Sequence, residues 1–322
     1  MTRSSIAVAI AAVVSAGVAA NAAAQYPDRS IRMIVPFAAG SATDTSARLY
    51  AAELSKQLGQ QVIPDNRAGA GGALGMQVLV KAAPDGYTIS YAGAGPLAIN
   101  RSITPNLPYD VEKEVQAVSQ AVSAPLMLAV SPTLPVKNVK ELIALAKRRP
   151  GQLANGSAGT GTVGHLAGEY FKMMSGIDIL HVPYKGGAQA ATDVMSGQVQ
   201  LMFDPASGVA PHVRSGRLRG LGVTGTARAK AFPELPTIAE SGLPGYEVTT
   251  WGGIIAPMGT PRALVLRLSE EVRKSGRAPT LAERYAALGA DPVTSTPEAF
   301  TTFIRQEHLK WAKVVKVAKI EP

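Results

Sequence analysis

The sequence predicts an α/β protein with two parallel-type sheets, helices on both faces of each sheet, and a ligand cleft between two lobes. Short apolar runs alternate with longer segments of helical periodicity, which is the order of a βαβ chain. These runs form two series that meet near residue 122. Because no low-complexity linker separates the series, we expect two sheets joined by direct strand crossovers.

The first series predicts a βαβαβ unit. Strands are expected at 32–37, 61–64 and 88–92, and helices at 45–58 and 74–82. A Gly-Ser-Ala-Thr-Asp loop at 40–44 follows the first strand, and a Gly-Ala-Gly-Pro loop at 93–96 follows the third. Helical crossovers of this kind place consecutive strands in parallel.

The second series predicts another α/β unit. Strands are expected at 126–130, 153–157, 179–182, 199–203 and 219–223, and helices at 139–149, 162–175, 187–196 and 206–215. The Pro/Gly-rich stretch 231–261 is expected to be irregular, and helices are expected at 262–274, 280–288 and 297–317. We therefore expect a discontinuous first lobe, 25–122 with 223–322, and a second lobe, 123–222.

Residues 1–24 are typical of a secretory signal peptide. Arg3 forms a basic start, 6–14 is apolar, and Ala22 to Ala24 supply small residues before Gln25. The apolar run is shorter than the roughly 20 residues that span a bilayer. We therefore expect export to the periplasm with cleavage near Ala24.

The composition excludes several classes of protein. The chain of 322 residues has no cysteine, which excludes disulfides, Cys-ligated metals, a cysteine nucleophile and a lipid anchor on cysteine. With 46% hydrophobic and 17% charged residues it is not disordered. Its net charge of +9 is spread along the chain and aromatics are only 5%, so nucleic-acid binding is not expected. Small anions are the favoured partners.

Three glycine-rich loops, at 39–41, 69–72 and 157–162, each follow a predicted strand and lead into a helix. A helix N-terminus presents free N–H groups and partial positive charge, and glycine lets an anion approach the backbone. Each loop alone is more often an ordinary turn. Together, at facing sheet edges, they predict a clamp for the two ends of a dicarboxylate.

Other chemistry has weaker support. Residues 159–164 fit G-x-G-x-x-G, but the nearest acid, Asp178, follows too soon for a dinucleotide site, so no cofactor is expected. The four histidines lack metal-ligand spacing, and no G-x-S-x-G elbow is present. Ser157 with His165 is the only candidate nucleophile–base pair that the sequence offers. An exported hydrolase that acts on a carboxylate substrate is therefore an alternative.

Single polar residues remain open to two interpretations. Asp44 either caps the following helix or orders water and backbone donors around a ligand. His165 lies in the first turn of a helix behind the 157–162 loop, where it either packs or touches a ligand. Tyr184 and Asp204 end strands, so they are candidates for a cleft wall and for an acceptor from a ligand.

An ordered set of motifs carries a resemblance to a known family. The motifs are VPF at 35–37 with Gly40 and Asp44, DNRAGAGG at 65–72, PDGYT at 84–88, YD at 109–110, GSAGTGT at 156–162, HLA at 165–167, VPYKG at 182–186, LPT at 235–237, GYE at 245–247 and APMGTP at 256–261. With these motifs, the chain resembles the extracytoplasmic binding proteins of the tripartite tricarboxylate transporter family, also called Bug receptors, over nearly the whole mature sequence.

That resemblance implies a two-lobed, type II-like periplasmic binding protein fold that closes on a small carboxylate by hinge motion. The residues that it assigns to one end of the ligand are Phe37, Gly40, Ser41 and Asp44. Those that it assigns to a carboxylate are Ser157, Gly159, Gly161 and Thr162, with Tyr184 and Asp204 nearby. Ala38 to Ser41 replaces the family's frequent Pro-Pro-Gly-Gly, which affects the expected ligand choice.

The resemblance also implies two integral membrane transporter subunits as partners and no catalysis by this chain, which we expect to be a monomer. A solute sensor that signals to a membrane kinase is the alternative. The acid itself stays open among amino acids, citrate-like tricarboxylates, aliphatic dicarboxylates and aromatic acids.

Overall fold

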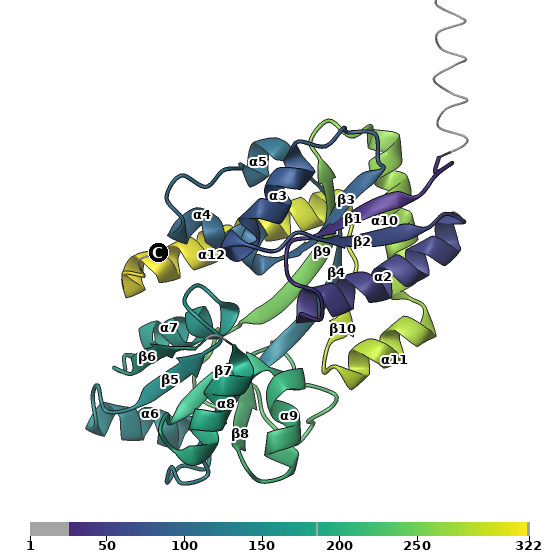
Figure 1. Ribbon diagram of the computed structural model, residues 1–322. Coiled ribbons are helices and arrows are strands. Elements are labelled where there is room, and N and C mark those ends of the chain that lie inside the picture. The colour runs from purple at the N-terminus through teal and green to yellow at the C-terminus, as the bar shows by residue number, and fades with distance from the viewer. Residues whose placement is uncertain (1–25, 185, 321–322) are drawn as a thin grey trace, which may run out of the picture.

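The computed structural model describes residues 26–184 and 186–320, and the predicted signal peptide at 1–24 lies outside them. Within the described residues, ten strands are joined by hydrogen bonds, eight of them along one path and two beside β4, and two groups of helices pack around them (Figure 1). The path divides into two sheets because the long strand β4 changes partners along its length. None of the described helices is both long and apolar enough to cross a membrane.

The first sheet confirms the predicted βαβαβ unit. Its strands, in order, are β2 (Val62–Asn66), β1 (Ile31–Val35), β3 (Thr88–Gly93), β9 (Thr249–Pro257) and the first part of β4 (Val115–Val130). Strand β1 runs parallel to β2 and β3, whereas β9 runs antiparallel to β3 and β4. The short strand β10 (Asp291–Pro292) pairs with β4.

The second sheet begins where β4 leaves β9. The rest of β4 pairs antiparallel with β7 (Leu201–Pro205) on one side and with β8 (Arg219–Val223) on the other. Strand β5 (Ala154–Ser157) then pairs in parallel with β7 and with β6 (Leu180–Pro183). All of these strands fall within or beside their predicted ranges, and both sheets contain a parallel portion.

The helices connect these strands and cover the sheets. They are α2 (Ala42–Leu58), η1 (Ala70–Gly72), α3 (Ala73–Val80), η2 (Gly95–Ile99), α4 (Asn100–Ile103), α5 (Val111–Glu114), α6 (Val139–Arg148), α7 (Val163–Ser175), α8 (Gly187–Ser196), α9 (Ala206–Arg214), α10 (Arg262–Gly276), α11 (Pro279–Ala287) and α12 (Pro297–Ala318). The three helices expected after residue 261 are confirmed as α10, α11 and α12.

Three expectations about secondary structure were wrong. The stretch 231–261 contains β9, a buried central strand, and β4 begins at Val115 and not at residue 126. The sequences of both segments are rich in small residues, which hides their β character. The loop expected at 93–96 leads directly into η2 and α4, whose first residues are Gly and Pro.

A buried carboxylate ties α12 to the first sheet. The indole nitrogens of Trp251 in β9 and Trp311 in α12 both donate to Oε2 of Glu307, at 2.8 and 3.1 Å. Glu307 is only 6% exposed and also pairs with Lys310. Helix α12 packs against β4, η2 and α7, so it contacts elements of both sheets. Its hydrophobic side belongs to one core cluster that extends over both.

The close approach of α12 to β9 predicts a destabilising substitution. A Cβ on Gly253 would lie 2.3 Å from Cζ of the buried Phe300 and 2.7 Å from the carbonyl oxygen of Ser119. We expect Gly253→Ala to lower the free energy of unfolding by about 1–3 kcal/mol, since overpacked cores lose stability by that amount. Thermal or urea unfolding measures the change.

Gly95→Ala is the matched control, because a Cβ there meets its nearest atom only at 4.0 Å. It should leave stability unchanged or raise it slightly. Equal stability of Gly253→Ala and the unmodified protein would contradict the packing of α12 on β9.

Candidate functional site

A cavity of about 450 Å³ lies between the loops of the two sheets. The first sheet and its helices contribute Phe37, Thr43, Ala70, Gly71, Gly93, Ala94, Gly95, Pro96, Ile99, Asn100, Ile103, Thr104, Thr250 and Trp251, and the second contributes Thr160, Gly161, Thr162 and Val163. Several of these residues follow the carboxyl ends of β1, β2, β3 and β5. Ligands of open α/β sheets bind at such ends.

A second cavity, of about 330 Å³, adjoins the first. The two share Thr43, Gly93, Thr250 and Trp251 as lining residues. The smaller cavity continues from there to Gly40 and to Pro205, at the end of β7. We call the two cavities together the cleft.

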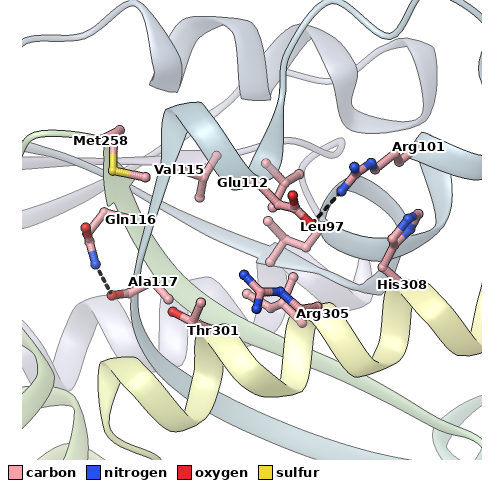
Figure 2. Close-up of a pocket in the computed structure, with 12 residues that line it drawn as sticks. Leu97, Arg101, Glu112, Val115, Gln116, Ala117, Met258, Thr301, Arg305 and His308 are labelled. Atoms are coloured by element: carbon pink, nitrogen blue, oxygen red, sulfur yellow. Dashed lines mark hydrogen bonds and ion pairs between the residues drawn. The ribbon is translucent and has the colours of Figure 1, made fainter.

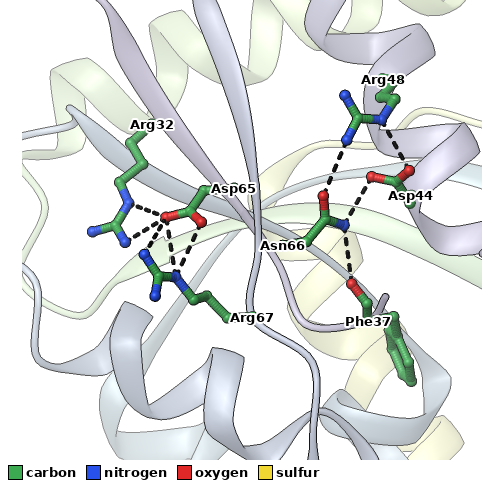
Figure 3. Close-up of polar contacts among 7 residues, drawn as sticks. All are labelled: Arg32, Phe37, Asp44, Arg48, Asp65, Asn66 and Arg67. Carbon is green, nitrogen blue, oxygen red and sulfur yellow. Dashed lines mark hydrogen bonds and ion pairs between the residues drawn. The ribbon is translucent and has the colours of Figure 1, made fainter. Parts of the chain in front are cut away.

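A buried carboxylate shapes the loop that follows β1 (Figure 3). Oδ2 of Asp44 accepts from the backbone N–H of Gly40 at 2.8 Å and from Nε of Arg48 at 2.9 Å. Its Oδ1 accepts from Nδ2 of Asn66 at 2.9 Å, and Nδ2 also donates to the carbonyl of Phe37. The Asp44 side chain therefore points into the loop and holds Phe37 and Gly40 in place.

The pKa of Asp44 reflects this network. Burial raises it, but the bonds from Arg48, Gly40 and Asn66 outweigh burial and hold the pKa below its ordinary value. The cap of α2 is Ser41, whose side chain accepts from the N–H of Asp44 at 3.2 Å. Of the two interpretations of Asp44, capping is therefore wrong.

A second carboxylate near this loop forms structural ion pairs. Asp65 at the end of β2 bonds to both Arg32 and Arg67 (Figure 3). These two guanidinium groups hold its pKa below the ordinary value even though burial raises it. Arg67 thus serves Asp65 and does not line the cleft.

The loop at 157–162 places the N-terminus of α7 at the cleft. Thr162 caps the helix: its Oγ1 accepts from the N–H of His165 and donates to the carbonyl of Gly159 at 2.7 Å. Gly159 and Gly161 have φ angles of +135° and +76°, which favour glycine. A Cβ on Gly161 would also lie 2.5 Å from Cδ1 of Ile103, across the cleft. Both backbone shape and space therefore favour glycine at 161.

Two stacked histidines support this loop from behind. The rings of His165 and His181 lie 3.6 Å apart at 16°, and Nδ1 of His165 accepts from the N–H of Gly161 at 3.1 Å. Nε2 of His181 lies 2.7 Å from Oγ of Ser157. Burial, the neighbouring ring and Lys172 lower the pKa of His165 to about 3, and burial and Lys172 lower that of His181 to about 4. Both rings are therefore neutral near pH 7.

These contacts revise the predicted nucleophile–base pair. The histidine beside Ser157 is His181 and not His165, whose Nδ1 accepts from Gly161. Ser157 is only 1% exposed, and its hydroxyl also bonds to the backbone of Gly159. These contacts make Ser157 a support of the loop.

The structure brings only some of the predicted site residues to the cleft. Phe37, Gly161 and Thr162 line the larger cavity and Gly40 lines the smaller one. Those that lie in or behind the same loops are Ser41, Asp44, Ser157, Gly159 and His165.

Tyr184 and Asp204 line neither cavity. The Tyr184 hydroxyl donates to Asp193 at 2.7 Å. Asp204 lies beside Gly187 and Gly208, at the starts of α8 and α9, where burial raises its pKa to about 7. Pro205, which follows Asp204 in the chain, lines the smaller cavity, and Thr160 lines the larger one.

Several of the lining residues that the sequence did not reveal share one origin. Asn100, Ile103, Thr250 and Trp251 come from segments that the sequence did not mark as ligand loops, whereas Thr43 lies in the recognised loop at 40–44. The loop at 93–96 was recognisable as a strand end, and it does reach the cavity. Trp251 is 3% exposed and also lines both cavities.

The described side chains that line the larger cavity are uncharged. Among the residues that the structure describes, its lining contains no Lys, Arg, His, Asp or Glu, and its polar side chains are one amide and several threonine hydroxyls. Backbone N–H groups at helix N-termini add donors. No group of three potential metal ligands occurs in the described part of the chain. The arrangement suits an anion held by neutral donors and packed between apolar walls.

Comparison with known proteins agrees with this geometry. The sequence profile described as "Tripartite tricarboxylate transporter family receptor" matches residues 46–320. Protein BugT of Bordetella pertussis is 38% identical over 306 residues, covering 94% of each chain.

Two solved structures of carboxylate-bound proteins are similar to this chain in sequence and in fold. A protein of R. palustris solved with adipate has 36% identity and a TM-score of 0.81, covering 92% of this chain and 99% of its own. MatC from Rhodopseudomonas palustris, with bound malate, has 30% identity and a TM-score of 0.76, covering 90% and 100%.

The histidine pair predicts acid sensitivity. Since both pKa values are lower in the folded protein than the ordinary 6.5, the unfolded chain binds more protons. The contribution of the pair to stability is therefore fully present above about pH 6.5 and is lost as the pH drops toward 4. Each histidine lowers the free energy of unfolding by up to about 1.4 kcal/mol per pH unit in that window.

The double variant His165→Asn, His181→Gln tests this. Asn can place an acceptor where Nδ1 lies and Gln a polar atom where Nε2 lies, without titrating. Thermal unfolding between pH 7.5 and 5 should show a shallower decline for the variant. The same slope in both proteins would exclude the pair as its source.

Proposed function

Because the chain belongs to the tripartite tricarboxylate transporter receptor family, we propose that it binds one small carboxylate in the cleft and delivers it to a membrane transporter. The observation that carries the proposal is a cavity at the N-terminus of α7 that is lined from both sheets and, among 26–184 and 186–320, by no charged side chain. One carboxylate lies against Thr160, Gly161 and Thr162. The rest of the ligand packs between Phe37 and Trp251.

The two lobes close around the ligand as a hinge. Strands β4 and β9 run out of the first sheet, and they are the connections about which the lobes turn. We place the crossovers at Pro125 and Thr249. The bond from the Tyr246 hydroxyl to the carbonyl of Ala167, at 2.8 Å, supports assigning 224–248 to the second lobe. A ligand that touches both lobes shifts the open–closed equilibrium toward the closed form.

Aliphatic dicarboxylates are the class that we favour among the open acids. The relatives solved with adipate and malate bind acids of this kind. The apolar side chains Phe37, Ile99 and Ile103 suit a methylene chain, whereas the hydroxyls of Thr43 and Thr250 suit its polar ends. The remaining parts of the proposal are a periplasmic monomer and two integral membrane partner subunits.

A thermal-shift screen tests ligand class. We expect adipate or a related dicarboxylate to raise the melting temperature, because a ligand at 100 times its Kd stabilises the folded state by about 2.7 kcal/mol. Malate, citrate, glutamate and benzoate complete the panel. A shift with sugars or cations alone would exclude the carboxylate proposal.

Gly161→Ala tests where the acid binds. The new methyl group meets Ile103, and φ at 161 disfavours a side chain. We expect the Kd of the acid found in the screen to rise about tenfold, equivalent to 1.4 kcal/mol. Calorimetric titration measures it.

Gly176→Ala is the matched control, because Gly176 ends the same helix with φ +63° and has no atom within 4 Å of its Cβ position. It carries the same backbone cost but should keep the Kd. An equal loss of affinity in both variants would place the ligand elsewhere.

A further inference from the structure

A third cavity, of about 210 Å³, is lined by residues of η2, α4, α5, β4 and α12, and Figure 2 shows these side chains. Its lining residues are Leu97, Arg101, Val111, Glu112, Val115, Gln116, Ala117, Met258, Thr301, Ile304, Arg305 and His308. None of them lines the cleft. One face of the segment 95–103 presents Ile99 and Ile103 to the cleft, and the other presents Leu97 and Arg101 to this cavity. The two spaces are therefore separate.

The floor of the third cavity is apolar. Leu97 is 2% exposed, and Val115 and Ile304 are each 7% exposed. They come from η2, β4 and α12, three elements that pack together in one hydrophobic cluster. The floor is therefore a firm surface against which a short hydrocarbon chain can pack.

The polar lining has a surplus of positive charge. Its single carboxylate, Glu112, is bonded to Arg101 at 2.9 Å. His308 contacts the carbonyl of Ala98 through Nδ1 at 3.0 Å. Arg305 has no hydrogen bond or ion pair with any residue in the described part of the chain. In Figure 2 its guanidinium extends from α12 toward the space below Glu112 and Leu97.

We propose that this cavity is a second binding site, which takes a small monocarboxylate with a short apolar chain. The carboxylate pairs with Arg305, whose planar guanidinium matches two carboxylate oxygens. The chain packs on Leu97, Val115 and Ile304. One uncompensated cation suits one carboxylate, and the volume lies below the roughly 300–1,000 Å³ of pockets for drug-sized ligands.

Met258 provides a local probe for this site. It lines the third cavity and is the only methionine that lines any of the three. The mature chain labelled with [methyl-¹³C]methionine is titrated with hexanoate, and Met258→Leu assigns the signal. We expect a saturable shift of the Met258 methyl signal with hexanoate and a much weaker one with hexan-1-ol, which lacks the charge.

Arg305→Gln should raise the Kd for hexanoate about tenfold, as expected for the loss of a charge-assisted pair. Arg277→Gln is the matched control, since Arg277 is also exposed and lies outside all three cavities. It should leave the titration unchanged. Gly161→Ala, which changes the cleft, should also leave it unchanged, so this test and that of the cleft fail independently.

Three results would overturn the proposal. They are the absence of a saturable Met258 shift, an unchanged Kd in Arg305→Gln, and loss of the shift in Gly161→Ala. The last of these would mean that the Met258 signal reports binding in the cleft.

Discussion

The backbone hydrogen bonds of β4 are the constraint on which the rest of the structure depends. From Val115 to Pro125 this strand pairs with β9, and from Leu126 to Val130 it pairs with β7 and β8. One strand therefore belongs to both sheets. Because each sheet carries its own loops at the ends of its parallel strands, sharing β4 brings the loop after β1 and the loop after β5 to the same cleft.

The charged groups near the cleft are paired or buried, and none of the described residues that line the cleft is charged. Asp44 is satisfied by Arg48, Asn66 and the backbone of Gly40. The two histidines behind the other loop are held uncharged by burial. Neither group presents charge to the larger cavity, so its selectivity rests on backbone N–H groups, hydroxyls and shape. The overall positive charge of the chain acts only at longer range.

The sequence predicted the parts of this design that are local. Glycine-rich loops after apolar runs identified Gly40, Gly161 and Thr162, because a strand, a turn and a helix cap each leave a pattern within a few residues, whereas Phe37 was identified by the family resemblance. The partner of Ser157 could not be found in this way. His181 reaches it only because β5 and β6 pair in parallel, and 24 positions separate the two residues. The same limit concealed β9, whose Gly253 packs against Phe300 of α12 and whose Gly252 packs against Tyr91 of β3.

Helix α12 shows why the C-terminal segment resists assignment to one lobe. Glu307 fixes it to β9 through Trp251, its Ile304 and His308 face η2, and its surface packs on α7. Helix α7 begins at the loop that approaches Ile103 of α4. A motion that opens the cleft must therefore slide α7 along α12 or carry α12 with it. Since the buried Glu307 would lose the indole donor of Trp251 if α12 left β9, sliding at α7 is the less costly of the two.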